Sequence, residues 1–235
     1  MVYAAILAGG CGSRMQSDLP KQYLLINKKP IFIYSVEAFA AHPGVDSILL
    51  AVNDRYYDYA KKLLDKYCPK VSLTLINGGE DRLATLKNIL RHLRLKNAVA
   101  EDTILITHDA VRPFLDSRII TENIAAAERY GACDTVVPAT DTIVASDDGE
   151  FINACPPRDT IFHGQTPQTF QAQKLFILTE SLTETESKTV TDACSIFTLR
   201  GQPVKLVRGR PENIKITYPQ DMIFAEKYAQ TLKKP

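Results

Sequence analysis

Short apolar runs alternate along this chain with longer stretches in which apolar residues recur every three or four positions. Five runs are apolar almost throughout, which is typical of strands covered on both faces. They lie at residues 2–7, 47–52, 71–76, 103–107 and 135–138. Four stretches have the spacing of amphipathic helices. They lie at residues 31–41, 54–67, 81–93 and 117–130. This alternation predicts right-handed crossovers and an α/β fold with a doubly wound, mainly parallel sheet.

The pattern changes after Pro138. Residues 142–154 alternate between apolar and polar positions and contain the turn signal DDG at 147–149, which predicts a two-stranded arm. Because a lone hairpin is marginal in water, we expect this arm, at about 139–163, to pack against another surface such as a second copy of the protein. Further on, the pattern again indicates a strand and a closing helix, and we predict one domain over residues 1–235.

Composition narrows the class of protein. The chain has 235 residues, 28 basic and 27 acidic side chains and a net charge of +1, which argues against broad binding to nucleic acid or to an anionic membrane. No apolar run approaches the roughly 20 residues of a membrane span. Residues 1–10 lack a positively charged start and run into glycines, so we expect a strand there and not a signal peptide. The five scattered cysteines favour a reducing, cytoplasmic setting without a disulfide framework or zinc site.

A glycine-rich turn follows the first apolar run. Residues 7–15 read LAGGCGSRM, and PKQ follows at 20–22. Closely spaced glycines let backbone N–H groups form an anion-binding concavity, but the spacing matches neither the dinucleotide fingerprint nor a phosphate loop ending in Lys-Ser/Thr. A tight turn with two solvated cations is the plain alternative. The presence of Arg14 and Lys21 beside Pro20 and Gln22 favours a triphosphate site.

Two more loops follow apolar runs. After the third, NGGEDR at 77–82 opens a helix with Thr85 in its second turn. Its glycines suit a base or ribose lying against the backbone, and a loop capped by Asp81 is an equal alternative. After the fourth, THDAVRPF at 107–114 places Asp109 at the carboxyl end of a central strand, a suitable position for Mg²⁺.

His108 is the tempting general base in this loop. A phosphate monoester is already an adequate nucleophile, so we predict instead a hydrogen-bonded structural histidine. Arg112 either binds a phosphate or braces the loop. Near the end of the chain Arg208, Arg210 and Lys215 form the densest basic patch, which is either a solvated face or the wall of a phosphate site.

These motifs together resemble the cytidylyltransferases that act on small polyol phosphates. The resemblance rests on AGGxGxRM with PKQ, HDxxRP at 108–113, QTPQ at 165–168 and NIKIT at 213–217, and it covers essentially the whole chain in order. It implies a Rossmann-like nucleotidyltransferase fold, Mg²⁺, CTP and a polyol phosphate as substrates, and a homodimer. Val111, Phe114 and the segments 141–144 and 164–170 are closer to the ribitol 5-phosphate group, which makes CDP-ribitol for teichoic acid, than to the 2-C-methyl-D-erythritol 4-phosphate group of isoprenoid synthesis.

The resemblance also implies roles by position. Arg14, Lys21 and Lys215 would stabilise the reacting α-phosphorus and the departing pyrophosphate, and Asp109 would lie beside Mg²⁺. The polyol phosphate would be held by four residues, some supplied across a dimer by the arm. They are Arg112, Thr142, Arg158 and Thr166. The nucleotide would be held by a larger set, namely Leu7, Ala8, Gly9, Gly10, Gly12, Gly79, Asp81, Arg82, Thr85, Asp109 and Ala110.

Two rival functions use the same sheet topology. A nicotinamide dehydrogenase needs the dinucleotide fingerprint and an acidic residue after the second strand; Asp54 is a faint candidate, but the glycine spacing fails. A non-catalytic nucleotide-binding regulator would be excluded by release of pyrophosphate from CTP when a polyol phosphate is added.

Overall fold

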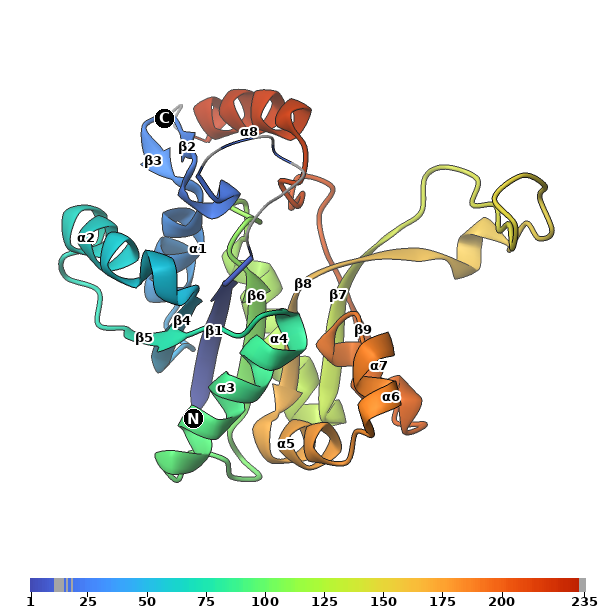
Figure 1. The fold of residues 1–235 in the computed structure, drawn as a ribbon, viewed down its shortest axis with the longest axis horizontal. Coiled ribbons are helices and arrows are strands. Elements are labelled where there is room, and N and C mark those ends of the chain that lie inside the picture. The colour runs from blue at the N-terminus through green and yellow to red at the C-terminus, as the bar shows by residue number, and fades with distance from the viewer. Residues whose placement is uncertain (11–14, 16, 18, 233–235) are drawn as a thin grey trace.

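The computed structural model describes residues 1–10, 15, 17 and 19–232 and is built around a seven-stranded sheet (Figure 1). Its strands are β1 (Val2–Ala8), β4 (Ser47–Val52), β5 (Thr74–Asn77), β6 (Ile104–Asp109), β7 (Ala132–Pro138), β8 (Phe162–Gln171) and β9 (Lys205–Arg208). They are ordered β5-β4-β1-β6-β8-β7-β9. Only β8 among them runs antiparallel to its neighbours β6 and β7, which confirms the mainly parallel sheet.

Helices cover both faces of the sheet. They are α1 (Ile31–Ala40), α2 (Tyr57–Tyr67), α3 (Arg82–Leu95), α4 (Ser117–Tyr130), α5 (Ala172–Glu180), α6 (Glu184–Thr189), α7 (Ala193–Leu199) and α8 (Pro219–Thr231). Core residues of α1, α2 and α4 share one apolar cluster with Ile6 of β1, while α3, α5 and α7 share another with Ala5. Neighbouring strand residues point to opposite faces, so each central strand is buried on both sides, as the apolar runs predicted.

A smaller cluster lies beyond the carboxyl ends of the central strands. The short strands β2 (Leu25–Ile26) and β3 (Lys29–Pro30) pair there, and α8 lies over them (Figure 1). Ile26, Val111 and Ile216 pack with Ala225 of α8. The loop after β6 and the segment before α8 are thereby held at the same end of the sheet.

Three elements differ from the sequence expectations. The strand expected at 71–76 begins only at Thr74, because the backbone N–H of Val71 bonds back to Cys68 in a turn and only four residues pair with β4. The strand β8 was not predicted, since Gly164 and Pro167 interrupt its pattern. The arm projects from the body between β7 and β8 (Figure 1), but it holds a single bridge, Ala145 with Ala154, and not a two-stranded ladder.

The arm lacks a ladder for a physical reason, since within one chain it has no neighbouring sheet or core to support it.

The described residues include no helix with the length and apolar character needed to cross a membrane.

Candidate active site

A cleft of about 260 Å³ opens at the carboxyl ends of the parallel strands. This is where ligands bind in open α/β sheets. Its wall combines the glycine turn after β1, the loop before α3, the end of β6 and the segment before α8. The lining residues are Leu7, Ala8, Gly9, Gly10, Lys21, Gln22, Gly79, Glu80, Asp81, Arg82, Thr85, Asp109, Val111 and Lys215.

The glycine turn is tied to the PKQ segment by one buried side chain. Gln22 Nε2 donates hydrogen bonds to the carbonyl oxygens of Ala8 (2.8 Å) and Gly10 (2.9 Å). This pairing places the neighbouring Lys21 in the cleft wall, where only 9% of the residue is exposed. Gly12 and Arg14, which the sequence also assigns to this turn, lie outside the described residues.

The opposite wall is the start of α3. Asp81 caps the helix by accepting a bond from Ala84 N–H (2.7 Å), which was one of the two alternatives that the sequence left open, and Thr85 Oγ1 accepts a bond from Gly79 N–H (2.9 Å). A Cβ on Gly79 would lie 2.6 Å from the carbonyl carbon of Ala84, so only glycine fits there. The helix amino terminus, which carries partial positive charge, therefore borders the cleft closely.

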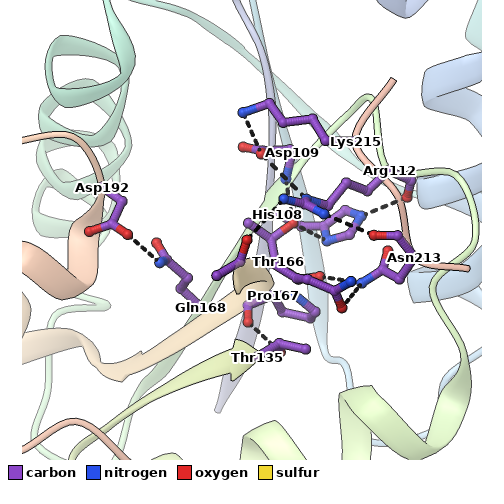
Figure 2. A network of polar contacts seen from close by, with 12 residues as sticks. His108, Asp109, Arg112, Thr135, Thr166, Pro167, Gln168, Asp192, Asn213 and Lys215 are labelled. Atoms are coloured by element: carbon purple, nitrogen blue, oxygen red, sulfur yellow. Dashed lines mark hydrogen bonds and ion pairs between the residues drawn. The ribbon is translucent and has the colours of Figure 1, made fainter. Parts of the chain in front are cut away.

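Asp109 forms the charged floor of the cleft. Its Oδ1 pairs with Arg82 Nη1. Its Oδ2 lies 3.0 Å from Lys215 Nζ and 3.7 Å from Arg112 Nε (Figure 2). Burial alone would raise the pKa of Asp109, but these three cations outweigh it and hold that pKa far below its ordinary value. The carboxylate is therefore ionised and leaves a net positive cluster facing the cleft.

His108 lies behind this floor and is fully buried. Its Nε2 is 3.1 Å from the carbonyl oxygen of Arg112, and its Nδ1 is 3.0 Å from Thr166 Oγ1 (Figure 2). Burial lowers the pKa of His108 to about 4, so the ring is neutral near pH 7 and bonded at both nitrogens. The prediction of a structural histidine is confirmed.

Hydrogen bonds to buried residues hold the segment that carries Lys215 against the cleft. Asn213 Nδ2 donates to the carbonyl oxygen of Thr166 (2.8 Å), and Arg112 Nη1 donates to the carbonyl oxygen of Asn213 (2.8 Å) (Figure 2). The rest of the basic patch does not join it. Arg210 pairs with Asp116 (2.9 Å), and neither it nor Arg208 belongs to the cleft lining.

Comparison with known proteins decides the class of this site. The family model described as "IspD: 2-C-methyl-D-erythritol 4-phosphate cytidylyltransferase" matches residues 2–231. The chain belongs to this family. It is thus a cytidylyltransferase, one of the nucleotidyltransferases.

Solved structures are similar in fold to this protein over nearly its whole length. A 4-diphosphocytidyl-2C-methyl-D-erythritol synthase from Anaerococcus prevotii is 27% identical, with a TM-score of 0.80 and coverage of 97% of this chain and 96% of that one. The 2-C-methyl-D-erythritol 4-phosphate cytidylyltransferase of Francisella tularensis is 26% identical, with a TM-score of 0.80 and coverage of 96% and 98%. The corresponding enzyme of Thermus thermophilus is 25% identical, with a TM-score of 0.71 and coverage of 98% and 100%.

The cytidylyltransferase cleft gathers most of the residues assigned to it from sequence, and five of those described lie elsewhere. Ala110 is fully buried, with its N–H bonded to the carbonyl oxygen of Leu7. Arg112 and Thr166 are buried beneath the floor, where Thr166 Oγ1 also accepts a bond from Asp109 N–H (3.1 Å). Thr142 and Arg158 lie on the arm, outside the cleft lining of their own chain.

Three residues that line the cleft were not assigned to the site from the sequence. They are Gln22, Glu80 and Val111. Gln22 and Glu80 adjoin residues that were assigned, so their motifs offered a signal. The resemblance singled out Val111 for the identity of the polyol but did not place it in the site, because an apolar residue after a buried strand indicates core as readily as a ligand contact.

Proposed function

We propose that this enzyme transfers the cytidylyl group of CTP to D-ribitol 5-phosphate, giving CDP-ribitol and pyrophosphate for teichoic acid synthesis. One observation supports a triphosphate substrate above all. Lys21 and Lys215, which are distant in sequence, line the same cleft together with Arg82 and the amino terminus of α3. Such fixed positive charge is what a triphosphate and a departing pyrophosphate need.

The proposed reaction is an in-line displacement. A phosphate oxygen of ribitol 5-phosphate forms a new bond to the α-phosphorus of CTP, and the bond from that phosphorus to the bridging oxygen of the β-phosphate breaks. Pyrophosphate leaves with the electron pair, so no proton has to be removed from the nucleophile. The neutral, fully bonded His108 agrees with a reaction that needs no general base. The protein contributes positioning and charge stabilisation.

We propose further that CTP enters as its Mg²⁺ complex, in which the ion neutralises phosphate charge. Mg²⁺ commonly takes one or two carboxylates together with phosphate oxygens and water. Asp109 is the ionised carboxylate on the floor of the cleft, and the ion would share its two oxygens with Arg82 and Lys215. The described residues include no group of three or more His, Cys, Asp or Glu side chains suited to a metal.

The identity of the polyol rests on few positions. Val111 supports ribitol 5-phosphate, because it lines the cleft where the methylerythritol enzymes usually have alanine, and Phe114 packs edge-on against Tyr228 of α8 beside it. The second candidate is 2-C-methyl-D-erythritol 4-phosphate. It is favoured by the description of the matched family and by the titles of the similar structures.

A homodimer is part of the proposal. The arm exposes large apolar side chains, with Phe151 74% and Ile152 64% exposed. Apolar groups on a projecting segment favour a partner surface. Thr142 and Arg158 of the arm would then reach the cleft of a second copy, where the polyol phosphate needs cationic and hydroxyl partners.

The test is to incubate the protein with CTP and Mg²⁺ and with each polyol phosphate separately, following pyrophosphate release and the CDP-alcohol by mass spectrometry. We expect CDP-ribitol, formed with a kcat/KM at least tenfold above that for the methylerythritol product. A preference for methylerythritol phosphate would refute the ribitol assignment alone. Absence of both products would refute the proposed reaction.

A further inference from the structure

A buried glutamine connects the cleft to two carboxylates that have no place in the reaction above. Gln168 lies in β8, with Thr107 of β6 on one side and Asp134 of β7 on the other. It is only 2% exposed, and its backbone carbonyl accepts a bond from Thr107 Oγ1 (3.1 Å). Its backbone is therefore held between two neighbouring strands inside the sheet.

The side-chain amide of Gln168 has one orientation that satisfies its neighbours. Its Nε2 donates to Asp192 Oδ2 (2.9 Å) and to Asp134 Oδ1 (3.2 Å), and the first of these bonds is drawn in Figure 2. Its Oε1 accepts a bond from Arg82 Nη2 (3.4 Å). The Asp192 carboxylate only accepts and the Arg82 guanidinium only donates, so together they turn the amide nitrogen of Gln168 toward Asp192 and its oxygen toward Arg82.

Arg82 is thereby held at two points. One nitrogen, Nη2, faces Gln168, and the other, Nη1, pairs with Asp109 Oδ1. A planar guanidinium held at both ends has a defined orientation. Because Arg82 takes Oδ1, Oδ2 of the same carboxylate is left to Lys215, with Arg112 Nε at 3.7 Å, so the placement of Lys215 is coupled to that of Arg82.

We propose that Gln168, oriented by Asp192, is a positioning residue that sets Arg82 against Asp109 and so shapes the cleft for the CTP phosphates. This inference rests on the proposed function. Gln168 does not line the cleft, and it acts only through Arg82. Asp192 separately caps α7, since its Oδ1 accepts a bond from Ser195 N–H (2.8 Å).

A substitution at Asp192 can keep the helix cap while it changes the group that faces Gln168. Asp192→Asn keeps an oxygen for the cap, and Asn caps helices as well as Asp does. The new amide nitrogen, however, faces the Gln168 amide nitrogen. Gln168 then turns its oxygen toward Asn and its nitrogen toward Arg82, which removes the acceptor. Adding Gln168→Glu to this variant restores an acceptor for Arg82 and for the amide at position 192, and the third neighbour, Asp134, can donate to it in its protonated form.

The experiment measures CTP affinity with Mg²⁺ by titration calorimetry, together with melting temperature, kcat and KM. We expect Gln168→Met and Asp192→Asn each to raise the Kd for CTP about tenfold, the ratio for losing a hydrogen bond to a charged group. The double variant Asp192→Asn, Gln168→Glu should return to within about threefold of wild type. Thr169→Val is the control, because Thr169 bonds to Asn123 on the other face of β8, and it should stay within about twofold.

The outcomes separate this inference from the proposed function. Unchanged CTP affinity in both single variants, or a double variant that binds no better than Asp192→Asn, would overturn the positioning role. So would a lower melting temperature with unchanged affinity of the folded protein, since that assigns Gln168 to stability alone. A wild-type protein that binds no CTP would refute the proposed function itself.

Discussion

Replacing Asp134 by asparagine should stabilise the protein at high pH and do so much less at low pH. Burial is the main cause that raises the pKa of Asp134 from its ordinary 3.8 to about 7, and the negative charge of Asp192 acts in the same direction. The Gln168 amide, Arg112 and Arg82 oppose the shift and are already included in that value. The folded protein therefore binds a proton here that the unfolded chain has released.

The sign follows from proton linkage. Between about pH 4 and pH 7 the folded state binds more protons at this site, so the free energy of unfolding falls as pH rises, by about 1.4 kcal/mol per unit. A pKa raised from 3.8 to about 7 corresponds to a loss of about 4 kcal/mol above pH 7, and to roughly 1.5 kcal/mol at pH 5. Asp134→Asn removes the titrating group, so its stability relative to wild type should be about 2.5 kcal/mol greater at pH 8 than at pH 5.

Chemical unfolding followed by circular dichroism at pH 5 and pH 8 measures this difference. Thermal melting should show it as roughly 5–10 °C for a chain of this size. Asp116→Asn is the opposite-sign control. Burial disfavours its charge, but bonds from Ile119 N–H and Arg210 lower the pKa of Asp116, so its loss should cost more stability at high pH than at low pH. Equal effects of Asp134→Asn at the two pH values would refute the assignment of a raised pKa.

Three further predictions test the cleft and the arm. Lys21→Ala should lower kcat by roughly two orders of magnitude, about 3 kcal/mol of transition-state stabilisation. The control variant Lys61→Ala, on the exposed side of α2, should keep its kcat. Near-full turnover of the folded Lys21 variant would contradict a role of Lys21 in stabilising the transition state. Gly79→Ala should destabilise the fold by roughly 1–3 kcal/mol in thermal melts, whereas Gly10→Ala, whose Cβ meets no described atom within 4 Å, should leave the melting temperature unchanged. Phe151→Asp on the arm should shift the protein toward monomers in sedimentation velocity, and an unchanged sedimentation coefficient would argue against arm-mediated dimerisation.

Several features of the fold and cleft were predictable from local patterns. The central strands β1 and β4, and the first half of β6, are mostly apolar because both of their faces are buried, and burial of that kind leaves a signal in the sequence itself. The capping role of Asp81 was predictable too, since a cap depends on residues only three positions away.

The tertiary structure alone decided which strands pair and which charged side chains come into contact. The strand β8 contains Gly164 and Pro167, yet it lies inside the sheet because β6 and β7 supply its partners. No local signal indicates that Lys215 meets Asp109, or that Gln168 lies between Asp192 and Arg82. Periodicity along a chain reports how deeply each segment is buried. Contacts between charged groups depend on strand order and on the packing of loops that are distant in sequence, and these arise only when the whole sheet assembles.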